Sequence, residues 1–303
     1  MNYLITGGTG SFGKKAVEIL LADPSTKKII VFSRDELKQS EMAKILNDDR
    51  LRYFIGDIRD YQRLLMALKG INICIHAAAL KQVPSSEYNP FECVLTNIVG
   101  SQNVIRACMN NGVDKIIALS TDKAVHPVNL YGKTKAVMEH LFIASNHYSE
   151  HTEMSVVRYG NVIGSRGSVI PVFQEQAKTG MITVTHPDMT RFWITLEEGV
   201  RFVLYALSKM TGGEIFVPKL KSKKIIDIAK EIAPNAKITY SGVRPGEKIH
   251  EILIAPEEAY RTVEFDNNYV IHPAISYFGY IEGCGRKVEE GFEYSSKLPH
   301  IQS

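Results

Sequence analysis

Residues that can move protons are concentrated between Ser120 and Lys135, in the stretch STDKAVHPVNLYGKTK. Tyr131 and Lys135 are four residues apart, so on a helix they share one face. A free tyrosine titrates near about 10, but a neighbouring ammonium group favours the phenolate and makes it useful as a base. Thr121 can donate a hydrogen bond to the same substrate oxygen. Together these residues predict hydride exchange at a carbinol, in which Tyr131 moves the proton and a nicotinamide cofactor takes the hydride.

The Tyr-x-x-x-Lys spacing is weak evidence alone, because it occurs by chance in many helices. Its meaning depends on the elements that position it. Short apolar runs alternate with amphipathic segments: NYLIT, KIIVFS and LRYFIGD precede predicted helices over residues 11–23, 35–47 and 61–69. The runs INICIHAAA, KIIAL and MSVVRYG continue the series, and such nearly continuous apolar runs are typical of parallel strands covered on both faces. We therefore expect an α/β fold with a doubly wound parallel sheet of at least six strands, the Rossmann architecture.

The alternation loosens beyond about residue 160. GSRGSVIPVFQEQAKTG is typical of a glycine-rich loop leading into a helix, EEGVRFVLYALSKM of an amphipathic helix, and EIFVP of one more strand. We expect residues 1–165 to form a nucleotide-binding domain and residues 166–303 a smaller C-terminal substrate-binding lobe, with segments near 190–230 returning to the first domain. Ligands of such sheets bind beyond the carboxyl ends of the strands, where each motif described here falls.

A glycine-rich loop, TGGTGSFG, follows the first predicted strand and opens a helix. Glycines spaced three apart let the turn tighten and let backbone N–H groups approach a pyrophosphate at the helix N-terminus. A plain tight turn would also explain three glycines, but the preceding strand and following helix favour a dinucleotide site. The loop residues expected to contact the cofactor are Gly7, Thr9, Gly10, Ser11, Phe12 and Gly13.

The end of the second strand indicates which dinucleotide binds. An NAD site would place a carboxylate there, whereas this chain has Ser33 and Arg34, with Lys38 one turn into the next helix. These groups suit a 2'-phosphate, because Arg grips phosphate well, and they favour NADP. Asp35 follows directly and keeps NAD open as the alternative, since it could bind the ribose hydroxyls. Further cofactor contacts are expected from the ends of the third and fourth strands, at Asp57, Ile58, Ala77, Ala78, Ala79 and Lys81.

The position of the Tyr-x-x-x-Lys motif after LST, behind a glycine-rich first turn, resembles the extended short-chain dehydrogenase/reductase superfamily over essentially the whole chain. A simple dehydrogenase or epimerase would not need Asp122 and Lys123. If a hexose is first oxidised at C4, the ketone acidifies the C5 proton, and its removal lets the C6 hydroxyl leave. Lys123 with a pKa lowered by desolvation could take that proton, and a protonated Asp122 could donate to the departing hydroxyl. An exposed turn is the alternative interpretation of this pair.

The resemblance narrows because common nucleotide-sugar 4,6-dehydratases carry Asp-Glu where this chain has Asp-Lys, and their catalytic Tyr lies further along. This pattern is similar to the UDP-N-acetylglucosamine 4,6-dehydratases that invert C5, of the pseudaminic acid biosynthesis type. The other motifs that carry the likeness are SRDELKQ, HAAALKQVP, RYGNVIGSRGSVIPVF, MTRFWITLEEGV, GGEIFVPK and RPGEKIHE. The resemblance implies a UDP-6-deoxy-4-keto-sugar product, a tightly held NADP, and a homo-oligomer, either a dimer or a hexamer.

A UDP-sugar needs cations for its two phosphates and polar groups for its uracil, ribose and sugar. Arg191 and Arg244 suit the diphosphate, because a planar guanidinium binds phosphate oxygens bidentately, and Glu247 could hold the ribose hydroxyls. An interlobe salt bridge is the alternative for each arginine. The remaining residues expected at the substrate are Lys81, Asn161, Arg166, Ser168 and Val169.

Composition excludes several classes of protein. A net charge of +3 argues against a dedicated nucleic-acid or membrane-surface binder. No apolar run approaches the roughly 20 residues that span a bilayer, the N-terminus lacks a signal-like pattern, and the cysteines and histidines show no metal-ligand spacing. We therefore expect a cytoplasmic enzyme without a metal site. Two alternatives stay open: a UDP-sugar 4-epimerase that uses only Thr121, Tyr131 and Lys135, and a non-catalytic NADP-binding protein.

Overall fold

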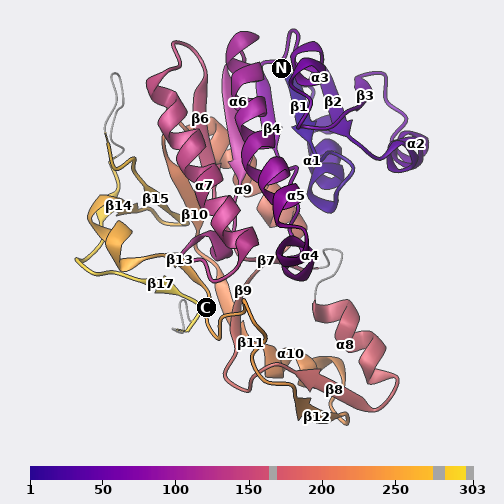
Figure 1. Ribbon diagram of the computed structural model, residues 1–303, viewed down its shortest axis with the longest axis vertical. Coiled ribbons are helices and arrows are strands. Elements are labelled where there is room, and N and C mark those ends of the chain that lie inside the picture. Colours follow the sequence, from indigo (N-terminus) through magenta and orange to yellow (C-terminus); the bar gives the residue numbers. More distant parts are fainter. Residues whose placement is uncertain (164–168, 276–283, 298–303) are drawn as a thin grey trace.

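A computed structural model describes residues 1–163, 169–275 and 284–297. Its main feature is a ten-stranded sheet in the order β16-β14-β15-β10-β6-β5-β4-β1-β2-β3 (Figure 1). The chain enters at β1, winds outward to β3, and then continues in the other direction from β4. This confirms the predicted α/β class with a doubly wound parallel sheet. The first six of its parallel strands are β1 (Asn2–Thr6), β2 (Lys28–Ser33), β3 (Leu51–Ile55), β4 (Ile73–His76), β5 (Lys115–Leu119) and β6 (Glu153–Val157).

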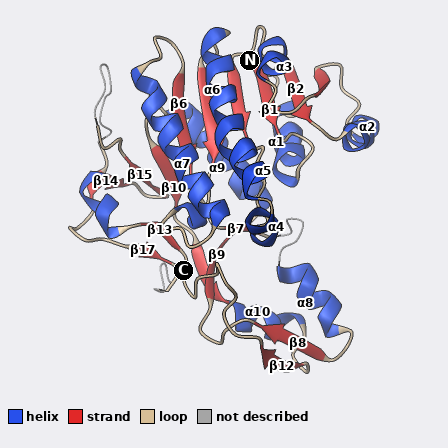
Figure 2. Cartoon of the chain, in the orientation of Figure 1, coloured by secondary structure: helices blue, strands red, loops and turns tan. Residues whose placement is uncertain are grey.

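Helices cover both faces of this sheet; α6 and α7 lie in front of it in Figure 1 and α9 behind it. Figure 2 shows the same layers, with red strands between blue helices. Because both faces are covered, the central strands are apolar throughout, and Leu4, Ile5 and Ile75 are fully buried. The helical segments of this part are α1 (Ser11–Leu21), α2 (Glu36–Ile45), α3 (Tyr61–Ala67), α4 (Val83–Tyr88), α5 (Pro90–Val94), η1 (Leu95–Val99), α6 (Gly100–Asn110), η2 (Asp122–Ala124), α7 (Leu130–Ala144), η3 (Ser145–His147) and α9 (Leu196–Lys209).

Later segments of the chain extend the same sheet. β10 (Ile215–Pro218) pairs with β6 in parallel, and α9 contacts α1. The antiparallel strands β15 (Asn268–Ile271), β14 (Thr262–Glu264) and β16 (Arg286–Lys287) continue from β10 to the edge. The part of residues 166–303 that lies in the sheet therefore reaches beyond the 190–230 region expected from the sequence. The domain boundary at residue 165 stays a prediction.

A second, smaller core lies below the carboxyl ends of the parallel strands in Figure 1. It is built where α8 (Val169–Ala177) and α10 (Ile225–Ile232) pack on the paired strands β8 (Met181–Val184) and β12 (Lys237–Tyr240). Its buried members are Phe173, Ile182, Val184, Met189, Ile225, Ile228 and Ala229. The connecting elements are β7 (Asn161–Val162), β9 (Thr190–Ile194) and β11 (Lys221–Lys224), which form one sheet, and β13 (Ile252–Ile254), η4 (Pro256–Arg261) and β17 (Tyr294–Ser295).

A buried ion network ties the last third of the chain to α7. The guanidinium of Arg158 lies 2.6 Å from the carboxylate of Glu139 in α7 and 2.9 Å from that of Glu258 in η4. Arg158 is only 3% exposed, so removing either carboxylate would leave a buried charge partly uncompensated, at a cost of about 3–5 kcal/mol. The network thus fixes the position of α7, which carries Tyr131 and Lys135.

Over the described residues, none of the helices combines the length and apolar character needed to cross a bilayer.

Candidate active site

A cavity of about 1230 Å³ opens where β1, β2, β4 and β5 end and the smaller core begins. This exceeds the roughly 300–1,000 Å³ of an ordinary small-molecule site, so it has room for a dinucleotide and a second ligand. Arg166 and Ser168, expected at the substrate, lie outside the described residues. The cavity is lined by all the other residues predicted for the site: Gly7, Thr9, Gly10, Ser11, Phe12, Gly13, Ser33, Arg34, Asp35, Lys38, Asp57, Ile58, Ala77, Ala78, Ala79, Lys81, Thr121, Asp122, Lys123, Tyr131, Lys135, Asn161, Val169, Arg191, Arg244 and Glu247.

The glycine loop forms a cradle that larger residues would fill. Gly7 has a φ of +66°, and a Cβ there would lie 3.0 Å from the backbone of Ala78. A Cβ on Gly13 would lie 2.4 Å from the carbonyl oxygen of Gly8, so α1 could not pack as closely on the loop. The helical hydrogen-bond ladder of α1 begins at Lys14 N, which donates to Gly10 O, so the preceding amides can point at an anion. These features fit the pyrophosphate of a dinucleotide.

The end of β4 is held by a buried histidine. Thr6 Oγ1 accepts hydrogen bonds from the amides of Ala77 (3.1 Å) and Ala78 (3.2 Å), so its own proton goes to Nδ1 of His76 (2.8 Å). Nε2 of His76 then donates to the hydroxyl of Ser101 (3.0 Å). Burial lowers the pKa of His76 to about 3, so this ring is neutral and acts as a fixed spacer. Through Thr6, the ring fixes the position of the backbone of Ala77 and Ala78, which we expect to lie beside the cofactor.

The groups at the end of β2 are already partly engaged. Asp35 caps α2 by accepting from Lys38 N at 3.0 Å and also pairs with the Lys38 ammonium, so its carboxylate serves the helix terminus. The side chain of Arg34 is 55% exposed and approaches Asp57 at 3.5 Å. Asp57 receives hydrogen bonds from Arg59, with Nη2 at 2.7 Å. Burial alone would raise the pKa of Asp57, but the Arg59 contacts outweigh it and lower the pKa.

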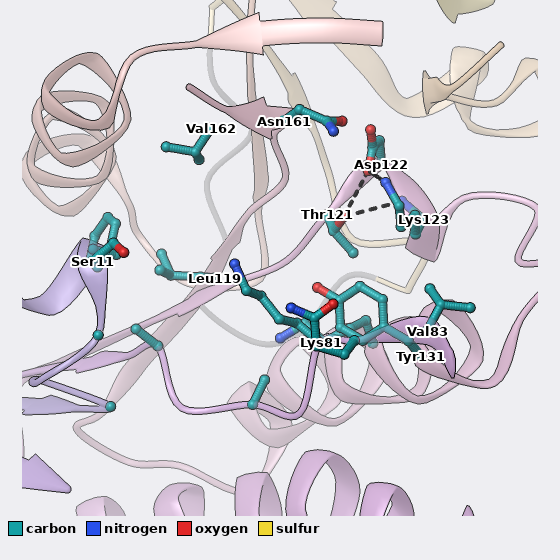
Figure 3. Close-up of a pocket in the computed structure, with 18 of the residues that line it drawn as sticks. Ser11, Lys81, Val83, Leu119, Thr121, Asp122, Lys123, Tyr131, Asn161 and Val162 are labelled. Atoms are coloured by element: carbon teal, nitrogen blue, oxygen red, sulfur yellow. Dashed lines mark hydrogen bonds and ion pairs between the residues drawn. The ribbon is translucent and has the colours of Figure 1, made fainter. Parts of the chain in front are cut away.

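Tyr131 and Lys135 lie one helical turn apart at the start of α7, which begins after the N-cap Asn129. In Figure 3 the Tyr131 ring lies close to Thr121. Burial raises the pKa of Tyr131 to about 12, while Lys123 and a hydrogen bond with Thr121 act in the opposite direction. The expected net lowering of this pKa is therefore wrong: burial outweighs the cations, and the cation that acts on the phenol is Lys123. Burial lowers the pKa of Lys135 to about 8, and its Nζ lies 2.9 Å from Sδ of Met138.

Asp122 and Lys123 face the cavity as a hydrogen-bonded pair. Oδ1 of Asp122 accepts from Thr121 Oγ1 (2.7 Å) and from Lys123 Nζ (3.1 Å), as drawn in Figure 3. Asp122 is 1% exposed, which excludes the exposed turn considered for this pair. Glu251 lies on the other side of the ammonium, with Oε1 at 3.4 Å from Nζ.

The charge state of Lys123 differs from the one that the sequence hypothesis requires. Burial alone would lower its pKa, but Asp122 and Glu251 together outweigh burial and raise it. The expected lowered pKa is thus wrong, because the second carboxylate, Glu251, comes from a distant part of the chain. Lys123 rests as an ammonium between two carboxylates.

The residues expected at the diphosphate differ in environment. Arg191 is 8% exposed, and its Nη1 donates to the carbonyl oxygens of Thr190 (2.7 Å) and Ile249 (3.2 Å). Arg244 is 66% exposed and lies 4.0 Å from Glu247. Arg244 can therefore reorient toward a ligand, whereas Arg191 presents a fixed charge.

Several buried oxygens in the cavity have no hydrogen-bond partner among the described residues. Buried polar groups are normally satisfied, so a ligand with hydrogen-bond donors fits here. The acceptor oxygens are Oδ2 of Asp122, Oδ1 of Asn161, Oε2 of Glu247 and Oε2 of Glu251. Two more atoms without a partner in the described part of the chain line the same cavity and can donate, Oγ1 of Thr96 and Nε1 of Trp193.

Sequence reasoning missed four residues that shape the site: Arg59, Asn129, Lys248 and Glu251. The last two belong to the motif RPGEKIHE, in which only Arg244 and Glu247 were predicted to contact the substrate. Lys248 Nζ donates to the carbonyl oxygen of Val125 at 2.5 Å and lies 3.7 Å from Glu251. Their signal was weak, because a charged residue in a loop is usually solvated, and only the fold brings these residues to the strand ends.

Several known proteins are similar to this chain over most of its length. The profile of the polysaccharide biosynthesis protein family matches residues 3–273. The chain is 52% identical over 307 residues to the UDP-N-acetylglucosamine 4,6-dehydratase (inverting) of Campylobacter jejuni subsp. jejuni, covering 97% of this chain and 92% of that protein. It is 45% identical to the UDP-glucose 4-epimerase of Rickettsia rickettsii, with 88% and 82% covered. The X-ray structure of Pen from Bacillus thuringiensis superposes with a TM-score of 0.91 at 37% identity, covering 99% of this chain and 94% of that one.

Proposed function

The chain belongs to the family of polysaccharide biosynthesis proteins, and from this premise we propose that it is a UDP-N-acetylglucosamine 4,6-dehydratase that inverts C5. The product is a UDP-2-acetamido-2,6-dideoxy-4-keto-hexose. The observation that carries the proposal is the buried Asp122–Lys123 pair, which lies beside Thr121 and Tyr131 in one cavity. A reaction that only oxidised C4 would require neither Asp122 nor Lys123.

The site fits a nicotinamide dinucleotide, because the glycine cradle and the ends of β1, β2 and β4 line one continuous cavity. When bound, this cofactor supplies a hydride acceptor for C4 and later a hydride donor for C6. Tyr131 takes the proton of the C4 hydroxyl, and Thr121 hydrogen bonds to the same oxygen. Lys123, the cation that acts on this phenol, favours the phenolate, and Lys135, with a pKa of about 8, lies one helical turn from Tyr131 in the same cavity.

Elimination requires one base and one acid, and a single proton transfer supplies both. Moving a proton from the Lys123 ammonium to Asp122 along their 3.1 Å hydrogen bond gives a neutral amine and a carboxylic acid. The amine then takes the C5 proton, the C5–C6 double bond forms, and the C6–O bond breaks as Asp122 protonates the leaving hydroxyl. This releases one water and returns Lys123 to ammonium and Asp122 to carboxylate. The raised pKa of Lys123 makes the first proton transfer uphill, and the pair returns to its resting state once water has left.

Product analysis tests the proposal. Incubation with UDP-N-acetylglucosamine should give a sugar nucleotide lighter by one water in the mass spectrum, with an inverted C5 by NMR. The similarity to UDP-glucose 4-epimerases makes 4-epimerisation the second candidate. A product of unchanged mass would support the epimerase, and no turnover with a bound cofactor would support a non-catalytic role.

The finer assignments are proposals too. NADP is favoured over NAD because Arg34 is exposed at the end of β2 while Asp35 is occupied as the cap of α2. The proposed setting is a cytoplasmic lyase acting as a homo-oligomer, a dimer or a hexamer, whose product enters pseudaminic acid biosynthesis. The proposed substrate contacts are the diphosphate with Arg191 and Arg244, and the ribose with Glu247.

We expect Arg34→Ala to weaken binding of NADP by about 10- to 100-fold, the value of one charge-assisted hydrogen bond of about 1.5–3 kcal/mol. Binding of NAD should hardly change, because NAD has no 2'-phosphate. Titrations of both cofactors by fluorescence check this, with Arg52→Ala on the neighbouring β3 as the control outside the cavity. Equal losses for both cofactors would remove Arg34 from the 2'-phosphate site.

A further inference from the structure

We propose that Asn129 is a positioning residue for the nucleotide part of the substrate, because it ties the segment 244–251 to the first turn of α7. The inference rests on the proposed function, in which Arg244 and Glu247 of this segment bind the UDP moiety. Asn129 does not line the cavity and is 4% exposed, so it acts through the backbone that it holds.

The geometry of Asn129 uses both ends of one amide. Its Oδ1 accepts from Gly132 N at 2.8 Å, which caps α7. Its Nδ2 donates to the carbonyl oxygen of Gly246 at 2.7 Å. A capping Ser or Asp would supply the acceptor but could not also reach Gly246 with a donor. The choice of Asn at this N-cap thus follows from the second bond.

Gly246 is shaped for the same contact. Its φ is +80°, a conformation that L side chains rarely adopt, and a Cβ there would lie 3.1 Å from Cβ of Asn129. The close approach of the two backbones therefore depends on both residues.

The segment needs such anchors because it has little regular structure. Residues 241–250, all of them described, contain neither helix nor strand, so their position depends on contacts to neighbouring elements. Two further contacts reach the catalytic stretch, from Lys248 to Val125 and from Glu251 to Lys123. Asn129 holds Gly246, which lies between Arg244 and Glu247, so its contact is closer along the chain to these two residues than the other two contacts are. Holding this backbone before the substrate arrives lowers the entropy cost of binding.

The test compares two caps of the same helix. Asn129→Ser keeps a capping oxygen, adds no charge and loses the donor to Gly246. Glu87→Ala removes the other cap, the 2.6 Å bond from Leu130 N to Glu87, and leaves the tie to Gly246 intact. UDP is titrated by calorimetry into the wild type and each variant with the cofactor bound. Thermal unfolding and cofactor affinity are measured alongside.

Asn129→Ser should weaken UDP binding about tenfold, because the segment must then be ordered when UDP binds, without changing cofactor affinity. Its unfolding temperature should fall no further than that of Glu87→Ala, which loses one hydrogen bond of the same helix start. Gly246→Ala should weaken UDP binding by a similar factor, because it displaces the carbonyl oxygen that accepts the bond from Asn129. Glu87→Ala should lower the unfolding temperature and leave UDP affinity unchanged. The KM for the sugar nucleotide should rise in Asn129→Ser, while kcat stays close to that of the wild type.

Two results would overturn the inference. One is wild-type UDP affinity in Asn129→Ser. The other is an equal loss in Glu87→Ala, which would show that stability of α7, and not the tie, governs binding. UDP binding needs no turnover, so a wild-type protein that binds UDP but forms no dehydrated sugar would refute the proposed function alone. A wild-type protein that does not bind UDP would refute the inference.

Discussion

Lys123→Ala is expected to oxidise its substrate at C4 and then stop, with water loss reduced by about 10²- to 10⁴-fold, the usual contribution of a general acid or base. Oxidation depends on Tyr131, Thr121 and the cofactor, and none of these is removed. Elimination depends on the amine that takes the C5 proton. The reduced cofactor should therefore accumulate in a single turnover, seen as nicotinamide fluorescence. Exchange of the C5 hydrogen with deuterated solvent should be lost by NMR.

The matched control is Lys133→Ala, which removes an exposed lysine from the same part of the chain. It should dehydrate UDP-N-acetylglucosamine at the wild-type rate. If Lys123→Ala itself dehydrates at nearly the wild-type rate, Lys123 is not the base. In that case the buried carboxylate Glu251 would be the next group to examine, since it lines the same cavity.

Tyr131→Phe should block the reaction one step earlier, again by about 10²- to 10⁴-fold. Without the phenol no group takes the C4 proton, no ketone forms, and the C5 hydrogen stays non-acidic. This variant should show neither reduced cofactor nor C5 exchange, which distinguishes it from Lys123→Ala. The measurement is the same single-turnover experiment.

A second experiment on Tyr131→Phe tests the order of steps. Supplied with the 4-keto form of the 6-hydroxy sugar nucleotide, the variant should still release water, because Asp122 and Lys123 are intact. Failure to do so would mean that Tyr131 also takes part in elimination. Wild-type oxidation by Tyr131→Phe would remove it from the hydride step.

The parts of the structure that local patterns encode could be predicted from the sequence. The six parallel strands, the glycine loop and the positions of Thr121 and Tyr131 at strand and helix ends depend on neighbours within a few residues. The charge state of Lys123 could not be predicted in this way. Its second partner, Glu251, is more than a hundred residues away and reaches it only through the fold, so burial alone gave the wrong direction for the pKa.

The environment of Arg191 could not be predicted from the sequence either. Its motif MTRFW predicts a cation at the substrate, but the buried bond to the carbonyl oxygen of Ile249 depends on where the 244–251 segment packs. The edge strands β14 to β16 were missed for a similar reason. They are short, and they join the sheet through the antiparallel pairing of β15 with β10, which brings together segments about fifty residues apart.

The separate hydrophobic core around Phe173 has a consequence for how such proteins diversify. Its side chains pack on one another, and a different set of buried side chains packs around the main sheet. Changes that repack it, or that alter the surface it presents to the cavity, can accumulate without disturbing Thr121, Tyr131 and Lys135. Selection can in this way adjust which sugar is accepted while the redox half of the molecule is inherited unchanged.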